Sequence, residues 1–190
     1  VIDKAIAGVT DGRYGFERAV SRGKVERADA DAALARLTFS TNFEEAVSDA
    51  ELIVECVPER LALKVKVFRD LDRLAPDDAI LASNSSGFPL AALAAATDRP
   101  ENVIIWHWAS PPVVMKFAEI VVTEETDPSV VERVTALARA CARRTRGEEA
   151  ETLHHPRPRR EPRHEPRREQ HPLEKDRFEV LLPVTRSRMS

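Results

Sequence analysis

Four short apolar runs, separated by stretches with helical spacing, constrain the fold of this chain more than any other feature. The runs cover residues 51–57, 79–82, 103–106 and 117–122. Each is short and rich in Ile, Val, Leu or Ala, and is therefore expected to form a buried strand. Between the first two runs, apolar residues recur three and four positions apart, as on one face of a helix. Strands that alternate with helices favour an α/β fold with a parallel sheet.

The same pattern predicts the remaining elements. We expect a further short strand at 37–40 and helices at 1–20 (broken near Gly12 and Gly15), 28–37, 42–48, 58–74, 89–96 and 128–143. Asp29 or Asp31 is the expected cap of the second helix, and Thr41 or Asn42 that of the third.

The composition changes abruptly near Ala142. Between Arg146 and Arg177 the chain has 17 charged residues, five prolines and three apolar residues. Such a segment cannot bury enough apolar surface to offset the entropy lost on ordering. The sequence therefore predicts a domain at 1–143 and a disordered, charged Pro/Arg/His-rich tail at 144–190. Two alternatives stay open for the apolar patch from Phe178 to Val184 inside this tail: it packs against the domain, or it makes no contact with it.

Charge and cysteine usage narrow the class of protein. The net charge is −3, and the nine basic residues between Arg146 and Arg177 are nearly balanced by eight acidic ones, so we expect no nucleic-acid partner. Two cysteines are too few for a disulfide framework, and no apolar run is long enough for a membrane span. We expect a cytoplasmic protein without a membrane partner. The tail histidines are irregularly spaced among arginines, so no metal site is expected.

Polar side chains follow or end three of the apolar runs. Ser83-Asn84-Ser85-Ser86 comes after one run, His107 ends the next, and Glu119 lies inside the last. Ligands of open α/β sheets gather at the carboxyl ends of the strands, where a hydroxyl, an imidazole and a carboxylate can move protons. Burying Glu119 among apolar residues without a partner would be costly. Each residue also has a non-catalytic interpretation. His107 can be a hydrogen-bonded residue at a strand end, Glu119 can face solvent on an edge strand, and Ser86 can cap a helix or lie in a turn.

Three segments together carry a family resemblance. Residues 50–59 (AELIVECVPE) are similar to the strand and turn that open the second half of the NAD-binding domain in L-3-hydroxyacyl-CoA dehydrogenases. Residues 83–86 resemble that family's S/T-N-T-S-S motif, and 107–119 resemble its H-x-x-N-P-x-x-V-M-K-x-x-E motif. The resemblance extends from about residue 18 to about residue 142. It implies a Rossmann-like, doubly wound parallel sheet.

The resemblance also implies an activity: reversible NAD-dependent oxidation of (3S)-3-hydroxyacyl-CoA to 3-oxoacyl-CoA in fatty acid metabolism. His107 matches the general base, Glu119 the carboxylate that orients it, and Ser86 a serine that contacts substrate and cofactor.

Three further positions match family contacts to the cofactor. Glu59 and Lys64 correspond to residues at the nicotinamide half of NAD, although plain helix surface is the alternative interpretation for both. Ser110 stands where the family usually has an asparagine that contacts cofactor and substrate.

The sequence departs from the family at both ends. None of its six glycines forms the G-x-G-x-x-G turn that approaches the pyrophosphate. The first β-α-β unit is missing, so the sheet is expected to be partial and the strand at 51–57 to expose an apolar edge. The family's P-G-F segment and helical dimerisation domain have no counterpart. A chain truncated at both ends, with a frameshift near residue 142, is one hypothesis.

Two other functions stay open. A catalytically inactive remnant or interaction module is favoured by the missing phosphate loop. A related dehydrogenase acting on a hydroxy acid without CoA is favoured by Ser110 and by Trp108, which replaces a common phenylalanine.

Overall fold

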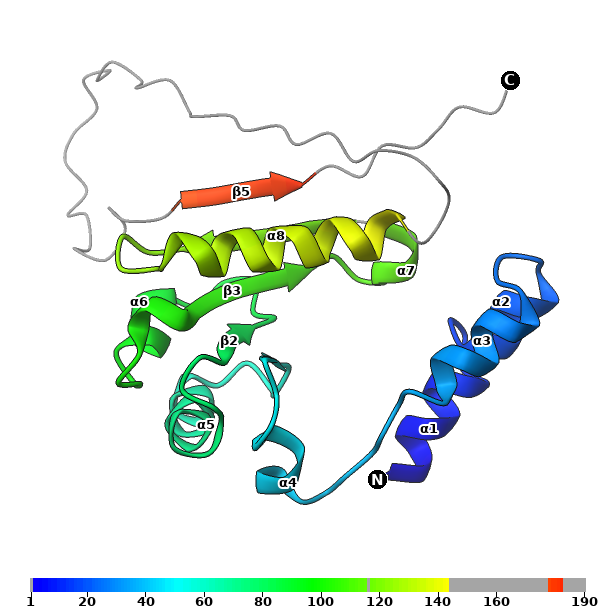
Figure 1. Cartoon of the computed structure of the whole chain (residues 1–190), viewed down its shortest axis with the longest axis horizontal. Helices are drawn as coiled ribbons and strands as arrows, with labels where there is room; N and C mark the ends of the chain where they lie inside the picture. Colours follow the sequence, from blue (N-terminus) through cyan, green and yellow to red (C-terminus); the bar gives the residue numbers. More distant parts are fainter. Residues whose placement is uncertain (1, 116, 144–177, 183–190) are drawn as a thin grey trace, which may run out of the picture. The chain divides into compact units, whose positions relative to one another are not determined.

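The computed structural model describes residues 2–115, 117–143 and 178–182 of the 190-residue chain. The chain divides into two compact units, Val1–Ser48 and Asp49–Ser190. Figure 1 colours the chain from its blue N-terminal helices to β5 in red. The tail histidines and most of the predicted tail lie outside the described residues.

The first unit consists of four helices, α1 (Ile2–Thr10), α2 (Phe16–Ser21), α3 (Arg27–Leu34) and α4 (Phe43–Val47). The predicted break between the first two is confirmed, because a turn closed by the Gly15 N–H on the Gly12 carbonyl (2.9 Å) separates them. The predicted cap Asn42 is also confirmed, since its Oδ1 accepts from the Glu45 N–H at 3.3 Å.

Two expectations for this unit are wrong. Helix α3 begins earlier than predicted and its N-cap is Glu26, which makes no side-chain cap bond, so neither Asp29 nor Asp31 caps it. Residues 37–40 form no strand. Leu37 is 43% exposed, and no described segment pairs with these residues. A strand needs a neighbouring strand to satisfy its backbone groups, and none of the described strands pairs with this run.

The second unit is built on a five-stranded sheet. Its strands lie in sequence order and are β1 (Leu52–Glu55), β2 (Ile80–Ser83), β3 (Val103–Trp108), β4 (Ala118–Val122) and β5 (Phe178–Leu182). The first three strands are parallel, as predicted, whereas β4 and β5 are each antiparallel to their neighbours. The prediction of a wholly parallel sheet is therefore wrong. Nine residues, 109–117, join β3 to β4, which is too short for the crossover that a parallel strand needs.

The position of β1 at the sheet edge agrees with the exposed edge that the sequence predicts. Among the described strands, β1 pairs only with β2. Val54 is 38% exposed on this strand. Open edges of this kind can pair with further strands. At the other side of the sheet β5, from within the predicted tail, pairs with β4.

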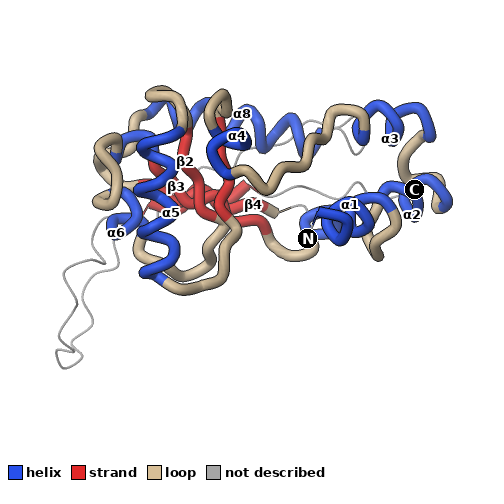
Figure 2. The backbone as a smooth tube through the Cα atoms, turned by 90° about the horizontal axis from the view of Figure 1, so that it is seen from below, coloured by secondary structure: helices blue, strands red, loops and turns tan. Residues whose placement is uncertain are grey.

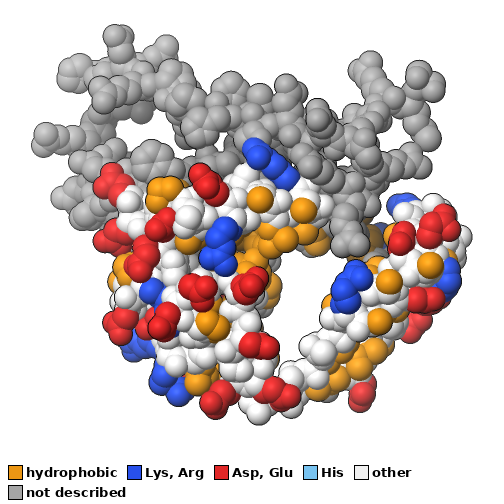
Figure 3. Space-filling model, in the orientation of Figure 1, with side chains coloured by type: hydrophobic (Ala, Val, Ile, Leu, Met, Phe, Trp, Pro, Cys, Tyr) orange, Lys and Arg blue, Asp and Glu red, His pale blue; other side chains and the backbone are white. Residues whose placement is uncertain are grey.

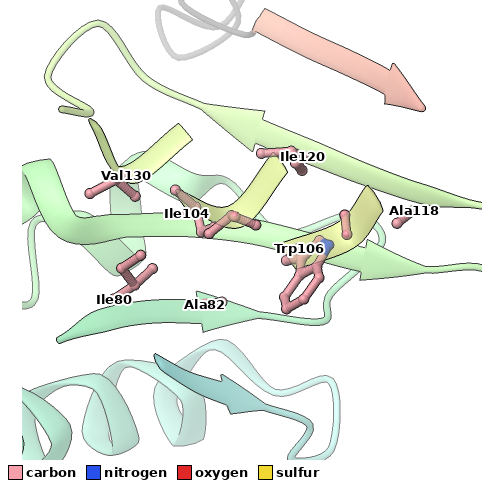
Figure 4. Packing of buried hydrophobic residues seen from close by; sticks show 9 residues of the cluster. Ile80, Ala82, Ile104, Trp106, Ala118, Ile120 and Val130 are labelled. Carbon is pink, nitrogen blue, oxygen red and sulfur yellow. The ribbon is translucent and has the colours of Figure 1, made fainter. Parts of the chain in front are cut away.

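Helices cover both faces of the sheet, so the doubly wound architecture is confirmed (Figures 1 and 2). They are α5 (Leu61–Leu74), α6 (Leu90–Ala94), the four-residue α7 (Pro112–Met115) and α8 (Pro128–Arg143). One face of β2, β3 and β4 packs against α8 (Figure 4). The buried residues of that cluster are Ile80, Ala82, Ile104, Trp106, Ala118, Ile120, Val130, Val134 and Ala138.

The alternation of side chains then fixes the face on which the polar residues lie. Ile104 and Trp106 on β3 and Ile120 on β4 point toward α8. Residues between them on the same strands point to the opposite face. His107 and Glu119 therefore project from the face that does not carry α8.

No helix in the described part of the chain is long and apolar enough to cross a membrane. Acidic and basic side chains are interspersed over the face of the second unit that Figure 3 shows.

Candidate functional site

His107 and Glu119 are direct neighbours across the sheet. They are register partners in the antiparallel pairing of β3 with β4. The Nδ1 atom of His107 lies 3.5 Å from Glu119 Oε2, and the two side chains are 27% and 17% exposed. Because β4 is antiparallel, a carboxylate in the middle of the last apolar run comes beside an imidazole near the end of β3. The partner that the burial cost of Glu119 demands is therefore His107.

The Ser83–Ser86 segment leaves the carboxyl end of β2 and is tied to β3. The last paired residues of these strands are Ser83 and Ile105. Beyond them, Asn84 Oδ1 accepts from the Trp108 N–H at 2.9 Å. This bond extends the contact between the strands past His107. Ser86 follows two residues later and is exposed.

A second polar cluster joins the ends of β1 and β2 to α5. Its centre is the ion pair of Lys64 Nζ with Glu55, at 2.9 Å from Oε1 and 3.0 Å from Oε2, with both side chains 1% exposed. The Ser83 hydroxyl donates to Glu55 Oε2 at 2.7 Å, and the Val57 N–H donates to Oε1. Every oxygen of this buried carboxylate therefore has partners, as burial of a charge requires.

Two more side chains close this cluster into a ring. Ser85 Oγ donates to the Glu59 carboxylate, 2.9 and 3.1 Å from its two oxygens, and Lys64 Nζ lies 3.7 Å from Glu59 Oε2. The Ser85 N–H donates to Ser83 Oγ at 3.4 Å. We call these residues the polar ring: Glu55, Lys64, Glu59, Ser85 and Ser83.

The polar ring carries more acidic than basic charge. It holds two carboxylates and one ammonium, which is also 5.7 Å from the centre of the Phe88 ring. The ammonium is closer to Glu55 than to Glu59. Glu59 is the one carboxylate of the ring that reaches solvent, with a side chain 53% exposed. The ring therefore presents a fixed, partly compensated negative charge beyond the end of β1.

Ser110 and α7 form the rim that follows β3. Ser110 is exposed and precedes Pro111 through a cis peptide bond. Val114 and Met115 of α7 are 49% and 54% exposed. The Ala109 N–H donates to the Phe117 carbonyl at 3.1 Å and closes this excursion onto the start of β4. The exposed apolar side chains of Val114 and Met115 thus follow shortly after the strand that carries His107.

The structure separates the residues singled out from the sequence into two groups. His107 and Glu119 form one pair, while Glu59 and Lys64 form part of the polar ring. Lys64 is 1% exposed, so the interpretation of it as plain helix surface is wrong. Ser86 and Ser110 lie on the loops after β2 and β3.

Sequence reasoning missed Glu55 and Asn84. A signal for Glu55 exists, because a glutamate inside the apolar run at 51–57 needs a buried partner. Lys64, nine positions later, is that partner.

The Glu59 carboxylate lies beyond the end of β1 and keeps an exposed side. One side of the Glu59 carboxylate is held by Ser85 and Lys64, and the exposed remainder can accept hydrogen bonds from sugar hydroxyls. Among the described residues, no group of three or more potential ligands is arranged to hold a metal ion.

Comparison with known proteins gives consistent results. The family model for the NAD-binding domain of 3-hydroxyacyl-CoA dehydrogenase matches residues 2–145. A 3-hydroxybutyryl-CoA dehydrogenase of Mycobacterium tuberculosis is 41% identical over 143 residues, which cover 73% of this chain and 50% of that protein. The 5-formyl-3-hydroxy-2-methylpyridine 4-carboxylate 5-dehydrogenase of Mesorhizobium japonicum is 35% identical over 109 residues, covering 57% and 35%.

A solved structure shows the same fold. The 3-hydroxybutyryl-CoA dehydrogenase of Escherichia coli superimposes with a TM-score of 0.67 at 31% identity, over 72% of this chain and 28% of that one. The chain spans half the length of the mycobacterial relative.

Proposed function

This chain belongs to the 3-hydroxyacyl-CoA dehydrogenase family, whose NAD-binding domain it shares, and we propose that it carries the proton-transfer site of an NAD-dependent (3S)-3-hydroxyacyl-CoA dehydrogenase. The observation that carries the proposal is the pairing of His107 with Glu119 across β3 and β4, at 3.5 Å and partly exposed. We place the activity in cytoplasmic fatty acid metabolism, with an acyl-CoA as the substrate.

In the proposed reaction, His107 acts as the general base. Its Nδ1 faces Glu119, which leaves Nε2 to take the proton of the 3-hydroxyl group. Glu119 orients the imidazole and stabilises the imidazolium that forms, as a carboxylate does beside other catalytic bases. Bound NAD would supply the acceptor for the hydride that leaves the same carbon as the carbonyl forms. In the reverse direction His107 returns the proton to the oxygen.

The proposed cofactor and substrate contacts lie on the neighbouring loops. Ser86 donates to the substrate oxygen, and Glu59 accepts from the sugar hydroxyls at the nicotinamide end. Lys64 contributes to the proposed cofactor site through its ion pair with Glu59. Ser110 lies on the loop between His107 and the exposed side chains of α7. Val114 and Met115 provide apolar surface for the acyl portion of the substrate.

Oxidation of NADH by the purified chain, followed by absorbance with acetoacetyl-CoA as substrate, tests the proposal. We expect turnover in the native chain and a loss of about a thousandfold in His107→Ala, the scale of a removed general acid–base group. The matched control is His164→Ala, which changes a histidine far along the sequence. Equal turnover in native protein and His107→Ala would refute the role of His107. A folded native chain without turnover would favour an inactive remnant.

A second candidate function is the oxidation of a hydroxyl group in a substrate without CoA. The observation that favours it is the similarity to the Mesorhizobium japonicum dehydrogenase, whose name describes a pyridine carboxylate, together with Ser110 at the usual asparagine position. Measuring NADH oxidation with free 3-oxobutanoate beside acetoacetyl-CoA separates the two. Faster turnover of the free acid would favour this second function.

A further inference from the structure

Glu55 is the one charged member of the polar ring that has no part in the proposed reaction. The Glu55 side chain is 1% exposed and contacts Lys64 and Ser83 instead of solvent. We propose that Glu55 is a positioning residue, which holds Lys64 and Ser83 so that the Glu59 carboxylate and Ser85 keep the geometry that accepts the cofactor. This inference rests on the proposed NAD site and identifies a residue that fixes the geometry of that site.

The first step of the argument is the number of partners of Glu55. Its carboxylate accepts hydrogen bonds from Lys64, from the Ser83 hydroxyl and from the Val57 N–H. These partners lie on α5, at the end of β2 and at the end of β1. One buried side chain therefore holds α5 and the ends of β1 and β2 together beside the proposed cofactor site.

The second step is the division of charge. Lys64 is 2.9 Å from Glu55 but 3.7 Å from Glu59, so its ammonium mainly compensates the buried carboxylate. Glu59 consequently keeps negative charge on its exposed side. If Glu55 were neutral, Lys64 would be free to move toward Glu59 and occupy the oxygen that a sugar hydroxyl needs.

The third step is the series of hydrogen bonds that connects Glu55 to the Ser83–Ser86 loop. Ser83 donates to Glu55 and accepts from the Ser85 N–H, while Ser85 donates to Glu59. A glutamine at position 55 replaces one acceptor oxygen by an N–H group. Either Val57 or Ser83 then loses its acceptor, and the bonds that follow in the ring are weakened.

Glu55→Gln, Glu59→Gln and the double variant test the inference. The matched control is Asp72→Asn, which removes a partly buried carboxylate on α5, paired with Arg99 at 2.8 Å. Amide hydrogen exchange is measured without ligand at Val57, Ser85 and the β3 residue Ile105. NADH affinity is measured by the fluorescence of the bound nucleotide.

We expect Glu55→Gln to speed exchange at Val57 or Ser85 by about tenfold more than at Ile105, because one charge-assisted bond is lost. NADH affinity should fall by about tenfold, and the double variant should bind no worse than Glu59→Gln alone, since coupled residues are not additive. Asp72→Asn should change neither the relative exchange nor the affinity.

Equal acceleration at Ile105 would show that Glu55 only stabilises the fold and would overturn the inference. Losses of affinity that multiply in the double variant would overturn it as well. If Glu55→Gln fails to fold, the uncharged Glu55→Gln/Lys64→Met pair, which leaves no buried unpaired ion, is measured in the same way. A native chain that does not bind NADH refutes the proposed cofactor site, while the exchange data still decide whether Glu55 holds the loop.

Discussion

The polar ring and the His107–Glu119 pair each place a carboxylate beside a basic group, but they differ in how completely those groups are bonded. In the ring, Glu55 and Lys64 are 1% exposed and joined by hydrogen bonds of 2.9 and 3.0 Å. The pair is partly exposed, and its closest approach is 3.5 Å. The ring has little freedom to move, whereas the pair can still bind and exchange a proton.

From this difference we expect the two clusters to have separate tasks. A saturated buried network fixes positions, because any rearrangement leaves a charge without a partner. A solvent-accessible imidazole beside a carboxylate is suited to proton transfer. Substitutions in the ring should therefore change stability and binding first, and substitutions in the pair should change turnover first.

The largest effect is expected from Lys64→Met. Removing the ammonium leaves the Glu55 carboxylate buried without its counter-ion, so the free energy of unfolding should fall by about 3–5 kcal/mol. Chemical denaturation followed by circular dichroism measures it. Lys66→Met is the control on the same helix, since Lys66 is 73% exposed in its pair with Asp70 and should matter little. A small effect at both positions would contradict the structural role of the ring.

Glu119→Gln should act on turnover and spare the fold. We expect turnover with NADH and acetoacetyl-CoA to fall by about a hundredfold, because the imidazolium loses its counter-charge. The melting temperature should change little, since the contact with His107 is partly exposed. A large loss of stability with unchanged turnover would reverse the assignment of the two clusters.

Asn84→Ala should give a smaller and mixed effect. The variant loses the 2.9 Å bond from the Trp108 N–H that ties the Ser83–Ser86 loop to β3. We expect about 1 kcal/mol less stability and about a fivefold drop in turnover, the scale of one ordinary hydrogen bond. Asn102→Ala, which removes an exposed bond to the Asp77 carbonyl, provides the comparison. Equal turnover in the two variants would argue against a role for Asn84 in placing the loop.

The smallest effect is expected at Asp127, before α8. Hydrogen bonds from Ser129 lower the pKa of this carboxyl below its usual value of 3.8. Because the folded pKa is the lower one, the stabilisation is present above the unfolded pKa and is lost as the pH falls through the folded pKa. Asp127→Asn keeps an acceptor but cannot titrate. The stability difference between native protein and variant should therefore shrink below pH 3.8; a difference independent of pH would contradict the expectation.

The sequence predicted the elements that local spacing determines. Helix α8 has the predicted bounds, 128–143, and the strands lie within one or two residues of the predicted runs. The partner of Glu119 also followed, because the burial cost required a partner and the family motif pointed to His107.

Features that depend on pairing between distant residues were not predictable in the same way. The direction of β4 depends on the short link from β3, which the apolar pattern alone does not reveal. The run at 37–40 has strand-like composition but no described partner. The partners of Glu55, Lys64 and Ser83, were identified only from the fold, which brings them together.

Thermal unfolding at increasing NADH concentration tests the central claim most directly, since it separates binding by the polar ring from chemistry at the pair. We expect the midpoint of the native chain to rise with NADH, as linkage requires. His107→Ala should retain this rise, and Glu59→Gln should lose most of it. A native midpoint that NADH does not move, or a rise that Glu59→Gln leaves intact, would contradict the account.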